Sequence, residues 1–467
     1  MDLRIALRGV SRNKRRSAMT LLTVAVGAVA VLIFGAFIVF LARSVQTGAV
    51  QRTGHLALYK QGFTQWGAAD PLGYNIPNYQ EIIALLRNDA EIGPDLAVIT
   101  PTQIVFGVAG NELAGTSKTF YGLGVIREDQ YRMERWNEYQ LPLKPLGPPI
   151  KDTEIEKGDI GIGLARMLRL CDGLKVPNCS PMRAPAASPA QATVPAGPDS
   201  QFSALLAQDR EARASGGRGG RNRVDLLSPT TTGAPNVVSM YAVSASNMGS
   251  KDVDDNLVKM SLPLAQRLVY GRHAPAVSSI VLQLKSTSQL APVQRRLSEL
   301  EHQAMFHLEA KTFEDLVPLY GQALKFLGMI FVFISIIIAV IVLFSVVNTM
   351  GMSVMERTTE IGTMRALGSS KFEISAQFVT EGVVLGLLGS MLGAAMAWLI
   401  SVMVNAANLK WSPPTSIEEL PLKLLLVDHP QFVLYTCAAL TALAALASVV
   451  PARRAALMDI GDALRHV

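Results

Sequence analysis

The stretch closest to a known nucleotide-binding pattern is "GNELAGTSKT", residues 110–119, where Gly110 and Gly115 have the spacing of a phosphate-binding loop. In such a loop a lysine directly follows the second glycine, and backbone N–H groups at a helix start hold the phosphates. Here the lysine is Lys118, two residues too late. We therefore predict no nucleotide site, no other cofactor and no catalytic centre in this chain.

Cysteine and histidine are equally sparse. Cys171 and Cys179 lie close together at the edge of a Pro- and Ser-rich stretch, whereas Cys437 lies in an apolar run. In an oxidising compartment the first two could form a disulfide, and in a reducing one they would be free thiols. No histidine stands near them, so their spacing predicts no metal site. The scattered histidines predict no catalytic set.

A short charged segment between two apolar runs has the most informative pattern. It reads "ERTTEIGTMRALGSS", residues 356–370, and the spacing of its apolar residues predicts a short helix ending at a glycine. One interpretation is a docking helix whose apolar side chains enter a partner's groove while its charges pair at the rim. The other is a solvated loop in which Arg357 pairs with Glu360. The residues assigned to docking are Glu356, Arg357, Glu360, Ile361, Gly362, Met364, Arg365, Leu367 and Gly368.

The apolar runs around this segment are long enough to cross a membrane. The chain has 467 residues, 49% of them hydrophobic and only 17% charged, whereas soluble domains have about 25% charged residues. A bilayer needs about 20 apolar residues, and four runs reach that length: 19–41, 326–350, 382–404 and 432–450. The first is expected to be a retained span, since it is too long for a signal peptide. The net charge of +6 is spread along the chain, which excludes a nucleic-acid binder.

Lysine and arginine predict the orientation. They are concentrated in the first 16 residues, in the loop 351–377 and in the tail 451–467, and are few in the loop 405–431. The positive-inside rule therefore places both termini and the loop 351–377 in the cytoplasm, and residues 42–325 outside the membrane. Residues 1–18 have the pattern of an amphipathic helix, which would either transmit motion or only anchor charge. The cytoplasmic parts are too small for an ATPase.

The spans carry glycine instead of charge. No ionisable residue lies inside the four apolar runs, so no ion or proton route is expected. The third span, assigned to 378–404, repeats glycine on one helix face, which allows close helix contact within the chain or between two copies. These glycines are Gly382, Gly386, Gly389 and Gly393.

Residues 42–325 alternate short strands and helices, which predicts an α+β domain. Strands are expected at 53–63, 96–110, 118–126, 237–246 and 278–284, with a last strand and turn in 306–316, and helices at 79–87, 159–170 and 289–304. A low-complexity insertion of about 172–222 is rich in Pro, Ala, Ser and Gly and is expected to be disordered.

The layout resembles the permease subunits of the MacB/FtsX-type ATP-binding-cassette superfamily, and within it the lipoprotein-releasing, LolC/LolE-like branch. The resemblance rests on "ERTTEIGTMRALGSSKFEI" (356–374), "EGVVLGLLGSMLGAAMA" (381–397), "PARRAALMDIGDALRH" (451–466) and outer segments such as "DVDDNLVKMSLPLAQRL" (252–268). It covers nearly the whole chain except about 172–222, which departs from the family.

This resemblance implies a bacterial inner-membrane permease with a large MacB-like periplasmic domain. It implies a separate ATPase dimer that binds the loop 351–377, a second permease copy or a paralogue, membrane lipids, and a periplasmic adaptor or lipoprotein as partners. Motion would pass through the first two spans, a mechanism called mechanotransmission, and would export or extract a lipidated or amphipathic substrate. The alternative is an FtsX-like signalling protein that regulates a periplasmic cell-wall hydrolase.

Overall fold

A computed structural model describes residues 14–67, 70, 72–142, 151–179, 222–246, 251–302, 307–411, 420–426 and 429–459. The chain divides into two compact units. We call residues 1–45, 319–411 and 421–467 the helical unit, and residues 46–318 and 412–420 the mixed unit. The expected amphipathic helix before residue 14, most of the insertion (180–221) and the tail from residue 460 lie outside the described residues.

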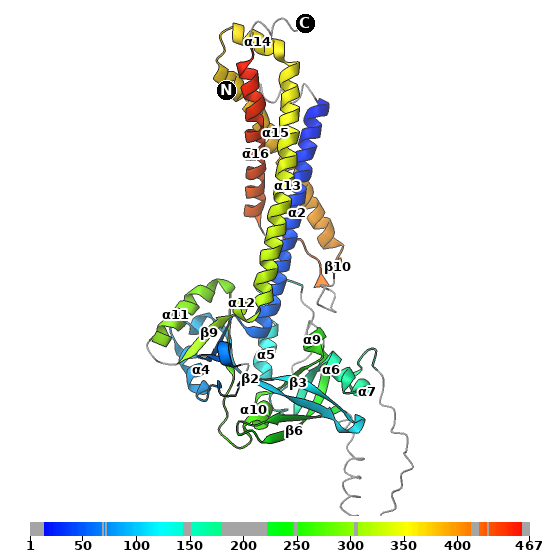
Figure 1. Cartoon of the computed structure of the whole chain (residues 1–467), viewed down its shortest axis with the longest axis vertical. Helices are drawn as coiled ribbons and strands as arrows, with labels where there is room; N and C mark the ends of the chain where they lie inside the picture. Colours follow the sequence, from blue (N-terminus) through cyan, green and yellow to red (C-terminus); the bar gives the residue numbers. More distant parts are fainter. Residues whose placement is uncertain are drawn as a thin grey trace, which may run out of the picture. The chain divides into compact units, whose positions relative to one another are not determined.

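The helical unit is built on helices that are long and apolar enough to cross a membrane (Figure 1). They are α2 (Lys14–Thr53), α13 (Pro318–Glu356), α15 (Lys371–Ala406) and α16 (Pro430–Leu457). All four extend beyond the predicted apolar runs. The clearest reason is at α15, where Ser370 and Glu373 form a reciprocal capping box that starts the helix before the apolar run. The short helix α14 (Thr358–Ala366) lies between α13 and α15, and β10 (Lys410–Trp411) and β11 (Leu420–Pro421) follow α15.

The predicted glycine face of α15 packs against two different helices of the same chain. A Cβ atom at Gly386 would lie 2.7 Å from Ala444 Cβ on α16, and one at Gly382 would lie 2.7 Å from Ser448 Cβ. Further along α15, Gly389 and Gly393 face α2 in the same way. The four glycines therefore allow close contact within the chain, the first of the two alternatives that the sequence leaves open.

The mixed unit is built on nine strands in the order β3-β7-β4-β6-β5-β2-β8-β1-β9, and β3 also pairs with β2. The first six strands of that order therefore close into a ring, and β2 continues from the ring into the pairing with β8. The strands are β1 (Leu56–Lys60), β2 (Leu96–Asn111), β3 (Thr116–Val125), β4 (Lys157–Gly161), β5 (Arg223–Pro229), β6 (Pro235–Ser246), β7 (Leu257–Ser261), β8 (Ser279–Leu284) and β9 (Leu308–Thr312).

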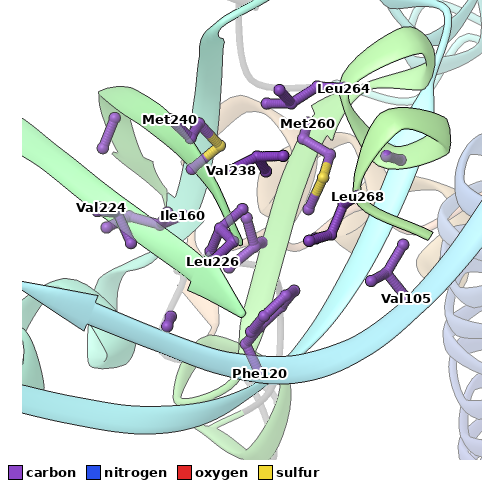
Figure 2. Packing of buried hydrophobic residues seen from close by; sticks show 14 of the residues in the cluster. Val105, Phe120, Ile160, Val224, Leu226, Val238, Met240, Met260, Leu264 and Leu268 are labelled. Atoms are coloured by element: carbon purple, nitrogen blue, oxygen red, sulfur yellow. The ribbon is translucent and has the colours of Figure 1, made fainter. Parts of the chain in front are cut away.

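Each part of this sheet has its own hydrophobic core. Inside the ring, Phe120, Ile160, Leu226, Met240 and Met260 pack together with side chains of α6 and α10 (Figure 2). The other core lies between β1, β8 and β9 and the helices α4 and α11. The helices of the unit are α3 (Phe63–Trp66), α4 (Tyr79–Asn88), α5 (Arg127–Glu134), α6 (Ile162–Met167), α7 (Cys171–Leu174), α9 (Lys251–Asp254), α10 (Leu262–Tyr270), α11 (Leu290–His302) and α12 (Phe313–Leu316).

The predicted strands are present as β1, β2, β3, β6, β8 and β9, and the helices predicted at 79–87 and 289–304 as α4 and α11. The strands β5 and β7, and the helix α10 after β7, were not predicted. The helix predicted within 159–170 is present as α6, but the stretch begins with the end of strand β4 instead of a turn. Strands β4 and β7 are mostly buried, so their sequences lack the alternation that marks a half-exposed strand. Strand β5 does alternate between buried and more exposed residues, and this signal was overlooked.

Residues 110–119 form the connection between β2 and β3, a hairpin in which Gly115 has φ +61°. A phosphate-binding loop would connect a strand to a helix instead.

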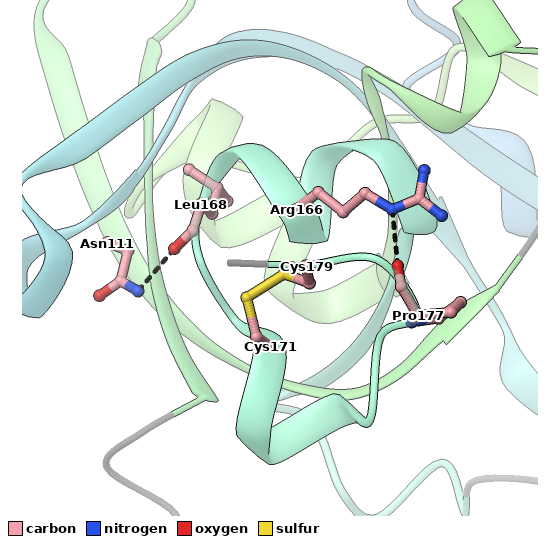
Figure 3. Close-up of a disulfide and its surroundings, with 6 residues drawn as sticks. All are labelled: Asn111, Arg166, Leu168, Cys171, Pro177 and Cys179. Atoms are coloured by element: carbon pink, nitrogen blue, oxygen red, sulfur yellow. Dashed lines mark hydrogen bonds between the residues drawn. A yellow bond between two sulfur atoms is a disulfide. The ribbon is translucent and has the colours of Figure 1, made fainter. Parts of the chain in front are cut away.

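A disulfide joins Cys171 and Cys179, where the chain enters the insertion (Figure 3). Next to it, the Asn111 side-chain amide donates to the Leu168 carbonyl at 2.8 Å and Arg166 Nε donates to the Pro177 carbonyl at 3.1 Å. The side chain of Asn222, where the chain leaves the insertion, lies against Gly173. The disulfide therefore fixes the first end of the insertion at α7, and the other end lies next to the same helix.

Candidate functional site

The candidate site is α14 and the turn that follows it, and local sequence explains both. Gly368 has φ +99°, a left-handed conformation that suits glycine, and the N–H groups of Gly368 and Ser369 donate to the carbonyls of Arg365 and Met364. The capping box of Ser370 and Glu373 begins α15 directly afterwards. Two consecutive helix signals therefore produce a compact helix–turn–helix rather than a flexible loop.

The inner face of α14 is part of the chain's own core. Ile361 is 1% exposed and packs with Val354, Ile374 and Phe378, and Met364 lies half-buried against the same cluster. We predicted from the sequence that Ile361, Met364 and Leu367 would fill a partner's groove, and the structure corrects this for Ile361. Thr358, Ile361 and Gly362 form the buried stripe of the helix, because residues three and four apart lie on the same side.

Three of the four predicted rim charges also make contacts inside the unit, and the first two of them pair with each other. Arg357 Nε donates to Glu360 at 3.0 Å, and Arg357 Nη1 lies 3.5 Å from a carboxylate oxygen of Glu381 on α15. The guanidinium carbon lies 5.7 Å from the centre of the Phe378 ring. The Arg357–Glu360 pair of the second interpretation therefore forms, but as part of a half-buried cluster rather than of a solvated loop.

Arg365 is at the other end of α14. Its Nη1 donates to the carbonyl oxygens of Ala456, at 2.9 Å, and Met458, at 3.3 Å, where α16 ends. The last carbonyls of a helix have no partner within that helix, so a cationic side chain placed there stabilises the helix end. Of the four predicted charged residues, Glu356 is the exposed one.

Glu381 was not among the predicted site residues. It is 5% exposed inside α15, one residue before the apolar run 382–404 and within the predicted span 378–404. An acidic residue at the very start of an apolar run was the available sequence signal, and it was given no role in the sequence analysis.

The turn between α14 and α15 presents an apolar tip to the outside. Leu367 is 83% exposed and Phe372 is 81% exposed, on the two sides of the Gly368 turn, and Met355 is 69% exposed. Thr359 and Thr363 lie on the exposed side of α14, between Met355 and Leu367 along the chain. Large apolar side chains exposed together at a helix turn are characteristic of an interaction surface. Phe372 was missed in the sequence because it follows the charged segment.

Residues 332–460 match the FtsX-like permease C-terminal family. This range is similar to an FtsX-like permease domain. The matched range contains α14, the Gly368 turn, Glu381 and the glycine face of α15, so the whole candidate site lies in the permease domain.

Similarity to individual proteins is local. The chain is 28% identical over 176 residues to the macrolide export ATP-binding/permease protein MacB of Bdellovibrio bacteriovorus, which is 36% of this chain and 26% of that protein. It is 28% identical over 165 residues (35% and 25%) to the pyoverdine export ATP-binding/permease protein PvdT of Pseudomonas entomophila. It is 43% identical over 82 residues (17% and 18%) to the ABC transporter permease YtrF of Bacillus subtilis. The chain thus spans about a quarter or less of the length of these relatives.

Among the described residues, no group of three or more His, Cys, Asp or Glu could hold a metal ion.

The comparisons support the superfamily that the sequence resembles, whereas the lipoprotein-releasing branch remains a prediction.

Proposed function

We propose that the chain is the membrane subunit of an ABC-type exporter and works with a separate ATPase. One observation carries the proposal: the FtsX-like domain holds α14 rigidly by its inner face and presents Leu367 and Phe372 to water. A rigid helix with an exposed apolar tip is suited to receive force from a partner. The named activities of MacB, PvdT and YtrF support a transport role.

The proposed substrate is a lipidated or amphipathic molecule taken up outside the membrane, and the proposed location is a bacterial inner membrane with the mixed unit in the periplasm. The described parts of the four spans hold a single buried carboxylate, Glu381, which lies near one helix end. A polar route through the apolar stretches therefore has no support, and movement of the mixed unit is the better proposal.

The docking role predicts a large effect from charges at the tip. Leu367→Asp combined with Phe372→Asp should weaken ATPase binding by about 100-fold or more, because burying each side chain contributes about 1.5–3 kcal/mol. Co-purification of an ABC ATPase with the chain from the membranes of its own host, and ATP turnover of that complex in lipid nanodiscs, measure the effect. Leu113→Asp, at a 59% exposed residue of the mixed unit, is the matched control. Wild-type binding by the double variant would contradict the assignment.

The topology predicts which sites a membrane-impermeant maleimide can reach. In a Cys437→Ser background, Thr232→Cys in the turn between β5 and β6 should be labelled in intact spheroplasts. Thr363→Cys on α14 should be labelled only after the membrane is permeabilised. Both residues are exposed, so access to the thiol depends on the side of the membrane. The reverse labelling pattern would invert the topology and remove the support for cytoplasmic docking.

A further inference from the structure

The two ends of α14 are fastened to two different helices. At its start, Arg357 occupies the bend between the end of α13 at Glu356 and the start of α14 at Thr358. From there its guanidinium contacts Glu381 of α15. At its other end, Arg365 contacts the last carbonyls of α16.

The contacts of Arg357 are of a kind that fixes direction as well as distance. Its side chain is 16% exposed, and that of Glu381 is 7% exposed. Arginine presents a planar set of donors, and here one nitrogen faces the carboxylate of its own helix while another faces that of α15. The Phe378 ring lies against the same guanidinium. Since one planar group contacts three partners, rotation of α14 relative to α15 would break at least one contact.

We infer that Arg357, Glu381 and Arg365 are positioning residues. Arg357 and Glu381 couple the start of α14 to α15, and Arg365 couples its end to α16. A force on the Leu367–Phe372 tip would then move the three helices as one body. This inference rests on the proposed function. It adds the third and fourth spans to the route that the sequence suggested, since α14 also follows α13 directly and packs on Val354 near its end. The glycines at 382 and 386, which face α16, lie directly beyond Glu381 and keep α15 and α16 in contact there.

A distance measurement tests the fastening without any ATPase. Nitroxide labels at Thr363→Cys and Arg454→Cys, both exposed, are placed in the full chain in a Cys437→Ser background. The unchanged site should give a narrow distance distribution by pulsed EPR. Arg357→Gln and Glu381→Gln should both broaden it, and Arg365→Gln should broaden it as well. Arg453→Gln, which removes an exposed arginine of α16, is the matched control and should leave it narrow.

ATP turnover then tests the coupling. With the ABC ATPase that co-purifies with the wild-type chain, Arg357→Gln should still co-purify, because the tip is unchanged, but the stimulated ATP turnover should fall about tenfold. A narrow distribution in Arg357→Gln and Arg365→Gln would overturn the inference, and so would a broad distribution with full stimulation. If Arg357→Gln does not fold, the distance distribution and the ATP turnover of Arg365→Gln test the inference instead, because that substitution removes only contacts to backbone carbonyls. If the wild-type chain recruits no ATPase, the proposed function fails, while the distance measurement still decides whether these residues fix α14.

Discussion

Gly393→Val is expected to separate helices α2 and α15 and to abolish the packed form of the helical unit. A Cβ atom at Gly393 would lie 2.5 Å from the Ala25 carbonyl oxygen, 2.5 Å from Ala28 Cβ and 3.0 Å from Ala25 Cα. Two of these atoms belong to the backbone of α2, which cannot move away as a side-chain end can. Overpacking of a core costs about 1–3 kcal/mol even where side chains can adjust. We therefore expect Gly393→Val to lower the free energy of unfolding by an amount at or above the upper end of that range.

Thermal unfolding of the full chain in detergent, followed by size-exclusion chromatography, measures this effect. Gly328→Val is the matched control, since Gly328 lies in α13 and a Cβ atom there would meet no other atom within 4 Å. The control should unfold like the wild type. If both variants behaved alike, the contact between α2 and α15 would not depend on the absence of a side chain at residue 393.

The glycine face illustrates what the sequence can predict. Repetition of glycine at helical spacing within an apolar run depends only on local order, so the face was identified without knowing its neighbours. The same is true of the spans and of the helix end at Gly368, where a glycine follows the last helical residue and φ is positive. The partner of the face was left open, because a pattern within one helix contains no information on the helix opposite.

The parts that failed all depend on residues distant in the chain. Ile361 has the same sequence pattern whether it faces a partner or its own chain, and the way α13, α15 and α16 come together around it decides between the two. Arg365 contacts carbonyls 91 and 93 residues away. A charged residue beside a membrane span is ordinarily assigned to the water phase, and the sequence gives no indication that a buried carboxylate stands opposite Arg357.

The mixed unit has its own buried polar centre, which includes His55 at the start of β1. The imidazole is 0% exposed, and its Nδ1 accepts the Leu284 N–H at 3.0 Å. Its Nε2 lies 3.3 Å from Thr287 Oγ1, which in turn donates to Glu138 at 2.8 Å. Since Nδ1 is an acceptor, the ring is neutral with its proton on Nε2. Edges of the Trp136 and Phe313 rings enclose the imidazole.

This environment sets the protonation of both groups. Burial lowers the pKa of His55 to about 4, and the nearby Glu138 carboxylate opposes that effect only in part. Burial alone would raise the pKa of Glu138, but hydrogen bonds from Ser286 and Thr287 outweigh it and hold that pKa below its usual value. Glu138 therefore loses its contribution to stability only at pH values more acidic than its usual pKa, at the acidic end of the range over which His55 is protonated.

Acidification from pH 7 to pH 4 is therefore expected to lower the free energy of unfolding of the mixed unit by about 3 kcal/mol through His55 alone. The unfolded chain binds a proton at His55 below about pH 6.5, whereas the folded unit resists protonation down to about pH 4. The contribution of His55 to stability is thus complete above pH 6.5 and is lost between pH 6.5 and about pH 4.

Urea unfolding of the full chain in detergent, monitored by tryptophan fluorescence at several pH values, measures how the free energy of unfolding changes with pH. In His55→Asn an amide oxygen can accept the Leu284 N–H, but the side chain does not titrate. The free energy of unfolding of this variant should therefore lose most of its dependence on pH. The control His273→Asn, at an exposed histidine of the same unit, should keep that dependence. An unchanged slope in His55→Asn would mean that the buried imidazole is not the group whose protonation destabilises the fold.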